Sequence, residues 1–265
     1  MHLQPGGLAP QPHAVVPDGD GPLTSEHPFP GPSTPLSRAG RSYTRSAVGF
    51  IDTLGAKTFA RSEAFLNALA YMVDLQQKVA QAQPGGAVRT VYFSDNIGAS
   101  IPLANLDATR AKRAVCQLLR LLAGIQLYYL RDFGILCRGG VVVGDCFHSQ
   151  NMIFGPALVE AYLLEGRAVS PRIAVSDEIA MLAGDDVVAL LPPEPLVDGG
   201  RTVGTARSID FLRAERPTPP GDTEYLARLR AVVAAKLDQS DATARAKWDW
   251  TAHQLATLED ARSAP

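Results

Sequence analysis

The sequence has few cysteines, and none of them is spaced for a metal site. Its 265 residues contain three, Cys116, Cys137 and Cys146, an odd number without a CxxC pair. Structural zinc sites use Cys and His at short, regular spacings, and disulfide frameworks use even numbers of Cys in secreted chains. We therefore interpret these residues as buried or idle thiols in a reducing compartment.

The chain also lacks a long apolar run and a strong excess of charge of one sign. No stretch approaches the ~18 uninterrupted apolar residues of a membrane span, and the first residues lack a basic segment followed by an apolar core. The formal net charge is −2, which gives no electrostatic reason to expect nucleic acid or an anionic membrane as a partner. We expect a cytoplasmic protein, and any polyanion that it binds to be small.

What is present is the composition of an ordinary globular protein, 46% hydrophobic and 20% charged, which suffices for one sizeable core. Residues 1–42 differ, because they hold nine of the 20 prolines and six glycines without apolar periodicity. Such a segment buries too little surface to offset its ordering entropy. We predict a disordered arm over 1–42, a folded domain over 43–195 and a mostly helical extension over 196–265.

Two short apolar strands each lead to one aspartate. The first passes through Val48–Ile51 to Asp52 and then Gly55, and the second through Val91–Phe93 to Asp95. An apolar run that ends in a lone carboxylate before a turn indicates a buried strand that presents this group at a sheet edge. Either aspartate, taken singly, is explained as well by the preference of Asp for turns and helix caps.

Hydrophobic periodicity predicts the order β-α-β-β-α-β for the first part of the fold. That is the ferredoxin-like, or split βαβ, arrangement of an α+β sandwich. Its strands one and three are usually central antiparallel neighbours, so Asp52 and Asp95 should converge at one edge. The predicted elements are a strand ending at Asp52, a helix over 62–82, a hairpin of strands 88–93 and 97–101, a helix from its N-cap Asp107 to Gly134, and a strand over 135–143.

Further elements follow this core. Residues 145–151 are expected to form an exposed polar loop, and His148 within it to be a surface or interface residue. Pro156 suits the first turn of a helix that runs to about Glu165. The rest is predicted as a strand over 172–175, a helix over 177–182, a strand over 187–191 broken by Pro192-Pro193, and helices over 223–237 and 241–258.

A pair of aspartates without His or Cys beside them suits a hard divalent ion such as Mg²⁺ or Mn²⁺ rather than zinc. Such ions keep coordination positions for water and phosphate. The chemistry that this favours is two-metal phosphoryl or nucleotidyl transfer on a nucleoside triphosphate.

Two segments resemble the metal-binding motifs of class III nucleotide cyclases, namely Phe50–Gly55 (FIDTLG) and Phe93–Asn96 (FSDN). The catalytic core of that class is also a split βαβ unit. Later segments are similar to the pyrimidine nucleotide cyclases of bacterial Pycsar anti-phage systems, over roughly residues 46–180 in all. These segments are Arg138–Asp145 (RGGVVVGD), Phe147-His148, Ile153–Glu165 (IFGPALVEAYLLE) and Pro171–Ile173 (PRI).

This resemblance implies that residues 43–195 are a catalytic domain that converts UTP, or alternatively CTP, to the 3′,5′-cyclic mononucleotide and pyrophosphate. It implies that Asp52 and Asp95 bind two divalent ions, Mn²⁺ or Mg²⁺, with the backbone carbonyl of Thr53, and that Phe50 contacts the nucleotide. Members of the class are dimers with sites at the subunit interface, so a homodimer is implied. So is a second-messenger role in antiviral defence, in which a separate effector protein responds to the cyclic nucleotide.

The chain departs from the adenylate and guanylate cyclase pattern. The purine-selecting Lys falls at Val91, and the ribose-binding Asn and phosphate-binding Arg fall at Val159 and Leu163. These replacements argue against a purine cyclase and leave the pyrophosphate without an assigned cation. The candidate cations are Arg138, which we take as substrate-binding although strand-edge solvation explains it equally, Arg167 and Arg172.

Two alternatives stay open. One is a purine cyclase with rearranged contacts, or a relative of diguanylate cyclases, although the chain has no Gly-Gly-Asp/Glu-Glu-Phe hairpin. The other is a non-catalytic nucleotide sensor that kept the fold. The presence of both Asp52 and Asp95 argues against the sensor.

Overall fold

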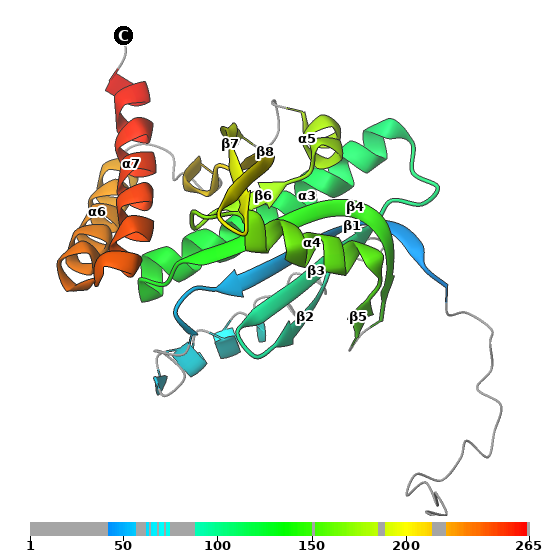
Figure 1. Ribbon diagram of the computed structural model, residues 1–265, viewed down its shortest axis with the longest axis horizontal. Helices are drawn as coiled ribbons and strands as arrows, with labels where there is room; N and C mark the ends of the chain where they lie inside the picture. Colours follow the sequence, from blue (N-terminus) through cyan, green and yellow to red (C-terminus); the bar gives the residue numbers. More distant parts are fainter. Residues whose placement is uncertain are drawn as a thin grey trace, which may run out of the picture. The chain divides into compact units, whose positions relative to one another are not determined.

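In this computed structural model, the chain divides into residues 1–40 and residues 41–265. The structure describes residues 42–56, 62–63, 65–67, 69–71, 73–74, 88–149, 152–184, 189–213 and 221–263 (Figure 1). The predicted disordered arm over 1–42 thus lies outside the described residues except for Ser42. The helix predicted over 62–82 is helical at the described positions between 63 and 74, and its remainder lies outside them.

A mixed sheet with the strand order β2-β3-β1-β4-β6-β8-β7 runs through residues 41–265. Its first four strands have the predicted ferredoxin-like arrangement, with β1 antiparallel to both β3 and β4, whereas β4 and β6 are parallel. The strands are β1 (Thr44–Thr53), β2 (Arg89–Phe93), β3 (Asn96–Pro102), β4 (Cys137–His148), β5 (Ile153–Phe154), which pairs with the end of β4, β6 (Ile173–Val175), β7 (Leu190–Asp198) and β8 (Arg201–Ile209).

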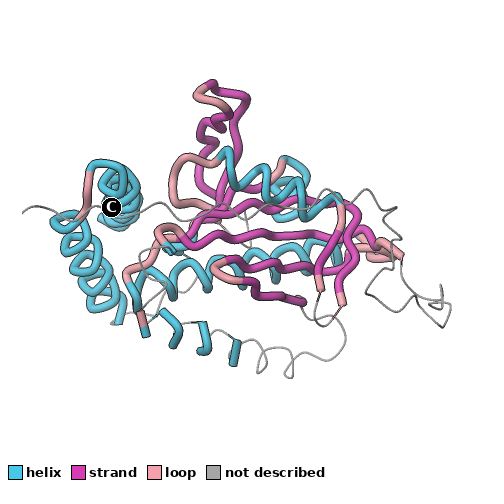
Figure 2. Tube along the Cα trace, turned by 60° about the horizontal axis from the view of Figure 1, so that its bottom comes forward, coloured by secondary structure: helices cyan, strands magenta, loops and turns pink. Residues whose placement is uncertain are grey.

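Helices lie on both sides of this sheet (Figure 2). The long helix begins at its predicted N-cap, Asp107, whose carboxylate accepts from the N–H of Arg110 at 2.8 Å, and its π-helical end is closed by Gly134 in the left-handed conformation. The helices are α3 (Ala108–Tyr128), which continues into the π-helical η1 (Tyr129–Phe133), α4 (Pro156–Arg167), α5 (Asp177–Ala183), the 3-10 segment η2 (Phe211–Arg213), α6 (Gly221–Gln239) and α7 (Ala242–Ser263).

Strand β1 is buried on both faces, and alternation along it decides where its aspartate points. Ala47 and Ile51 belong to the main core under α3, whereas Val48 and Phe50 pack in a second cluster with α4. Successive side chains of a strand point to opposite faces. Asp52, two positions after Phe50, therefore lies on the α4 face of the sheet.

Helix α4 lies unusually close to β4 because of Gly140. A Cβ at Gly140 would lie 2.2 Å from the carbonyl oxygen of Ala161 and 2.9 Å from the amide nitrogen of Glu165. Any larger residue would push the helix away from the sheet. The glycine thereby allows the end of α4, with Glu165, to sit directly over the strand that pairs with β1.

Strand β4 is longer than predicted. It extends to His148, and β5 pairs with its last two residues, so the predicted exposed loop over 145–151 is strand at 145–148, while residues 150 and 151 lie outside the described part of the chain. The polar residues of this stretch had indicated a loop, but Cys146 in it is 2% exposed and packs in the α4 cluster. The expectation was wrong because tertiary pairing overrode local composition.

Strand β7 also differs from the prediction, because it continues through Pro192-Pro193 instead of breaking there. It is the last strand of the sheet, where a proline costs no ladder hydrogen bond, and its register shifts between Leu191 and Glu194. The predicted boundary at 195/196 falls inside β7, and β8 follows it in the same sheet. Within the predicted extension, the described α-helices begin at Gly221, after β8 and the 3-10 segment η2.

The two C-terminal helices are found as predicted. Trp248, Leu255 and Leu258 of α7 and Leu229 of α6 belong to the main hydrophobic core. No helix in the described part of the chain is long and apolar enough to cross a membrane.

Candidate active site

The end of β1 and the β2–β3 turn meet at one edge of the sheet. Asp52 pairs with Asn96, the residue after Asp95, and the N–H of Thr53 donates to the carbonyl oxygen of Asp95 at 3.2 Å. The side-chain amide of Asn96 donates in turn to Asp95 Oδ1 at 3.3 Å. The structure therefore brings both aspartates to the same edge, as the topology predicts.

The turn that carries Asp95 is a two-residue hairpin loop. Phe93 pairs with Asn96, so that only Ser94 and Asp95 lie between the strands, and Ser94 has a φ of 60°. Left-handed backbone of this kind suits the tight turns that match the twist of antiparallel strands. The short loop fixes the position of Asp95 relative to β3, and hence to β1.

The environment of Asp52 disfavours its negative charge. Burial, with the nearby carboxylates of Glu165 and Asp95, raises the pKa of Asp52 to about 6, while the positive charges of Arg138 and Lys247 oppose this shift. Three carboxylates around one partly buried position repel one another in an environment of low dielectric constant. A divalent cation would relieve this repulsion.

Arg138 lies directly across the β1–β4 pair from Asp52. Its Nε donates to the carboxylate of Glu165, and its Nη1 donates to the carbonyl oxygen of Ala168 at 3.2 Å. The side chain of Glu165 is only 4% exposed, so this is a largely buried ion pair that needs both partners. Two nitrogens of the guanidinium are therefore engaged within the fold, and substrate binding by Arg138 stays a prediction.

The other two candidate arginines point elsewhere. Arg172 is 1% exposed and donates to the carbonyl oxygens of Ala206 and Pro195, at 3.2 and 2.8 Å. Arg167 forms an ion pair with Asp198 at 3.1 Å. Both guanidinium groups thus hold elements of the fold together.

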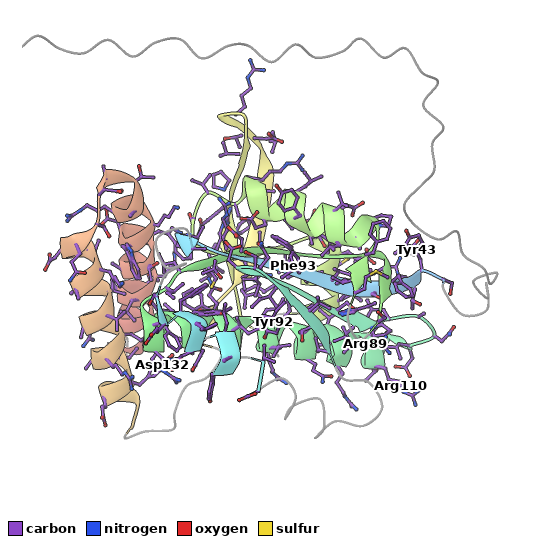
Figure 3. All side chains as sticks on the ribbon, turned by 90° about the horizontal axis from the view of Figure 1, so that it is seen from below. Tyr43, Arg89, Tyr92, Phe93, Arg110 and Asp132 are labelled. Carbon is purple, nitrogen blue, oxygen red and sulfur yellow. The ribbon has the colours of Figure 1, made fainter. Side chains whose placement is uncertain are left out.

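Phe50 lies under an aromatic cluster. Its ring meets that of Tyr162 edge-on at a centroid distance of 5.4 Å and that of Phe93 at 6.1 Å. Figure 3 shows Phe93 on the α4 side of the sheet and Tyr92 on the α3 side. Phe50 itself is 6% exposed, so a nucleotide reaches its ring only beside these two neighbours, and the contact stays a prediction.

The three positions at which the resemblance predicted purine, ribose and phosphate contacts are apolar here. Val91 packs against the α4 cluster, while Val159 and Leu163 are 57% and 46% exposed on α4. Together with Phe93 and Tyr162, the two α4 residues form an exposed surface that we call the apolar face. Exposed apolar residues that lie together usually mark an interaction site.

His148, which was expected as a surface or interface residue, is half-buried. Its Nδ1 lies 2.5 Å from the hydroxyl of Ser100 on β3, and Arg89 Nη1 donates to its carbonyl oxygen. Burial and the positive charge of Arg89 lower the pKa of His148 to about 4. It lies at the opposite end of β3 from Asp95, and so has no part in chemistry at the aspartates.

The groups beside the aspartates supply oxygen, not sulfur or nitrogen, for a metal. Cys137 pairs with Thr53 across β1 and β4, but complete burial raises the pKa of its thiol and keeps it protonated. The described residues contain no cluster of three or more His, Cys, Asp or Glu side chains placed to hold an ion. Two carboxylates alone fit Mg²⁺ or Mn²⁺, which complete their coordination with water and phosphate. A ligand role for the Thr53 carbonyl stays a prediction.

Two charged residues of this edge escaped the sequence prediction. Glu165 was expected only as the end of a helix, and Lys247 only as a member of another. Their place near Asp52 depends on how α4 and α7 pack on the sheet. For Glu165, the one signal in the sequence is the Gly-Gly pair at 139–140, which permits close packing of a helix on β4.

No protein-family model and no curated protein matches this chain. The similar solved structures include the adenylyl cyclase CyaB from P. aeruginosa, with a TM-score of 0.48, 16% identity, and coverage of 64% of this chain and 95% of that one. They also include the guanylate cyclase domain of RhGC from Catenaria anguillulae in complex with GTP, with a TM-score of 0.46, 16% identity, and coverage of 64% and 97%. At these values nothing about the activity of this chain follows from the likeness.

Proposed function

We propose that this chain is a pyrimidine nucleotide cyclase that converts UTP, or alternatively CTP, to the 3′,5′-cyclic mononucleotide and pyrophosphate. The observation that carries the proposal is the convergence of Asp52 and Asp95 at one sheet edge, where the hydrogen bond from Thr53 to Asp95 joins the two segments. The resemblance of Phe50–Gly55 and Phe93–Asn96 to the metal motifs of class III cyclases supports the same reading.

The reaction forms one bond and breaks another. The ribose 3′-oxygen attacks the α-phosphorus, the bond from this phosphorus to the bridging oxygen of the β-phosphate breaks, and pyrophosphate leaves with that electron pair. The 3′-hydroxyl proton is released to solvent. Asp52 and Asp95 would hold two divalent ions, Mn²⁺ or Mg²⁺, which when bound acidify the hydroxyl and neutralise the phosphates. The protein contributes mainly orientation, through Phe50 and the fixed β2–β3 turn.

The preference for a pyrimidine base is supported by Val91, which stands where the resemblance places the purine-selecting Lys, whereas Val159 and Leu163 replace contacts to the ribose and phosphates that all four nucleotides share. Neither Val91 nor Val159 has a group that could hydrogen-bond a purine or a ribose hydroxyl. An adenylate or guanylate cyclase would need other residues of this chain to take over these contacts.

We further propose that the protein is a homodimer through the apolar face, next to the aspartates. Phe93, Val159, Tyr162 and Leu163 are each 40% or more exposed, and the ring contacts of Phe50 join β2 to α4 within this surface. A second copy would bury this surface and close the site from water. The resemblance to Pycsar cyclases extends the proposal to a cytoplasmic second-messenger role in anti-phage defence, with a separate effector that responds to the cyclic nucleotide.

The test is to incubate the purified protein with each of the four ribonucleoside triphosphates and Mn²⁺ and to identify the products by mass spectrometry. We expect cyclic UMP or cyclic CMP from the wild type. We expect at least a 100-fold loss of it in Asp52→Ala and in Asp95→Ala, in the range found when transition-state charge stabilisation is removed. Asp145→Ala is the matched control, because Asp145 lies at the other end of β4, opposite Arg45.

Cyclic AMP or cyclic GMP as the main product would replace the pyrimidine proposal by the purine one. Absence of every cyclic product, with tight nucleotide binding, would favour the non-catalytic sensor. Turnover that persists in both aspartate variants would refute the metal site.

A further inference from the structure

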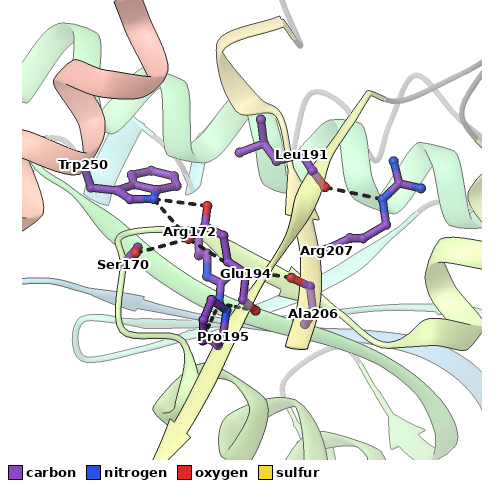
Figure 4. Close-up of polar contacts among 8 residues, drawn as sticks. All are labelled: Ser170, Arg172, Leu191, Glu194, Pro195, Ala206, Arg207 and Trp250. Carbon is purple, nitrogen blue, oxygen red and sulfur yellow. Dashed lines mark hydrogen bonds and ion pairs between the residues drawn. The ribbon is translucent and has the colours of Figure 1, made fainter. Parts of the chain in front are cut away.

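Helix α7 is fixed to the core sheet by a tryptophan. Trp250 Nε1 donates to both carboxylate oxygens of Glu194 on β7, at 3.2 Å each (Figure 4). Trp248, two residues earlier, is 7% exposed within the main core. Opposite sides of this stretch of the helix are therefore held, one by an apolar contact and the other by a hydrogen-bonded one.

The partner of Trp250 is itself held in place. Glu194 lies 3.6 Å from Nη1 of Arg172, and its oxygen Oε2 accepts from the hydroxyl of Ser170 at 3.5 Å. Arg172 is 1% exposed and also donates to the carbonyl oxygens of β7 and β8, as Figure 4 shows. A buried, multiply bonded guanidinium gives little freedom to the carboxylate beside it. The attachment of α7 is thus a built feature of the fold.

Helix α6 fixes the same helical pair at a second place. Arg228 of α6 forms an ion pair with Asp132 of η1 at 3.1 Å. A Cβ at the left-handed Gly134, just before β4, would lie 2.6 Å from Cε of Lys236, so the side chain of this α6 residue lies against the turn. Figure 1 shows α6 and α7 beyond the end of the sheet where β1 ends and β4 begins. That end of the sheet carries Asp52.

Lys247 lies on α7, close in sequence to Trp250. It precedes Trp250 by three residues, a spacing that places two side chains on the same side of a helix. Lys247 is partly buried, and its positive charge acts on Asp52 together with that of Arg138. Of these two cations, Arg138 already donates to Glu165 and Ala168.

The proposed reaction needs a cation for the leaving pyrophosphate, and α4 does not provide it at Leu163. Arg167 and Arg172 are bound to Asp198 and to the Glu194 cluster. A lysine suits the role because its flexible ammonium group can follow a phosphate as it leaves.

We propose that Lys247, carried by α7, binds the triphosphate beside Asp52 and Asp95, in place of a cation on α4. The inference rests on the proposed function for the identity of the substrate, but not for the contact itself. Helix α7 is then part of the substrate site, and the Trp250–Glu194 bonds are what position it.

The test compares Lys247→Met, which keeps most of the side-chain volume without the charge, with Lys247→Arg and with Arg245→Met. Arg245 is exposed on α7 and lies two residues away, so it provides loss of an equal charge from another side of the same helix. The probe is inorganic tripolyphosphate, whose binding is measured by isothermal titration calorimetry. Steady-state kinetics with UTP or CTP provide the second readout.

We expect Lys247→Met to weaken tripolyphosphate binding about tenfold or more and to raise KM by a similar factor, as loss of one charge-assisted hydrogen bond implies. Lys247→Arg should restore most of the binding, whereas Arg245→Met should behave as the wild type. Trp250→Phe should weaken binding less than Lys247→Met, and should add little to it in the double variant because both act through the same contact.

The two proposals fail in different ways. Cyclisation by Lys247→Met with an unchanged KM, or wild-type affinity of this variant for tripolyphosphate, would overturn the role of Lys247 and leave the cyclase proposal intact. A wild type that binds tripolyphosphate through Lys247 but forms no cyclic product would overturn the cyclase proposal alone. A wild type that does not bind tripolyphosphate contradicts the role of Lys247.

Discussion

The backbone N–H of Thr53 donates to the carbonyl oxygen of Asp95 at 3.2 Å, and so joins the end of β1 to the turn between β2 and β3. The residue before Thr53 is Asp52, so this one bond couples the backbones that carry both carboxylates. Asp52 is the second-to-last residue of β1, and Asp95 lies in the two-residue turn after β2, so neither aspartate is on a long loop. A site built in this way needs little rearrangement to accept an ion.

The first prediction concerns the loss of folding stability that the negative charge of Asp52 causes. The pKa of Asp52 is about 6 in the folded protein against 3.8 in the unfolded chain, so the folded state holds the proton more tightly. Stability therefore falls as pH rises from about 4 to 6, and above pH 6 the full cost is present. Without metal, Asp52→Asn should raise the free energy of unfolding at pH 7.5 by about 1–2 kcal/mol, after a discount for partial exposure.

Urea denaturation in EDTA measures this difference. The gap between Asp52→Asn and the wild type should narrow as the pH is lowered to 4.5, because the wild-type carboxyl becomes neutral too. If Asp52→Asn is less stable than the wild type at pH 7.5, or if the difference in stability does not change with pH, then the negative charge of Asp52 does not destabilise the folded state.

The second prediction concerns the apolar face. Leu163→Glu places a charge in the centre of the proposed dimer interface, where burial of an unpaired carboxylate is strongly unfavourable. We expect a monomer at micromolar concentration by sedimentation velocity, and loss of cyclase activity with it. Met181→Glu is the matched control, because Met181 is 78% exposed on α5 and outside this face. A dimeric, fully active Leu163→Glu would contradict the interface.

The third prediction concerns His148. Its pKa is about 4 when folded and 6.5 when unfolded, so the unfolded chain binds more protons between these values. The stability from this residue is complete above pH 6.5 and is lost as the pH falls toward 4. Between pH 6.5 and pH 4, the free energy of unfolding of His148→Asn should fall by about 1–2 kcal/mol less than that of the wild type. Thermal denaturation followed by circular dichroism measures this difference. Equal losses in the two proteins would show that His148 titrates normally.

The sequence predicted the central geometry because that geometry follows from topology. The β-α-β-β-α-β order makes β1 and β3 neighbours. The two-residue turn places Asp95 directly before Asn96, which pairs with Asp52. Because side chains alternate along a strand, Asp52 lies on the same face of the sheet as Val48 and Phe50, which is the face that α4 covers. These are local rules, and a single sequence suffices for them.

The surroundings of the aspartates could not be predicted in the same way. The buried pair of Arg138 and Glu165 joins residues 27 positions apart, and depends on the close approach of α4 to Gly140. The position of Lys247 depends on the docking of α7, in which Trp250 donates to Glu194 of β7. This strand was expected to end at Pro192-Pro193, so Glu194 was not expected to lie in it. Long-range packing of this kind leaves no periodic signal in the sequence.

The central claim is that Asp52 and Asp95 together bind divalent ions, and direct titration of Mn²⁺ followed by electron paramagnetic resonance tests it. The signal of free Mn²⁺ should fall as wild-type protein is added. Asp52→Asn and Asp95→Asn should each lose this binding, with Asp145→Asn unaffected. Binding that survives unchanged in both single variants would contradict the account.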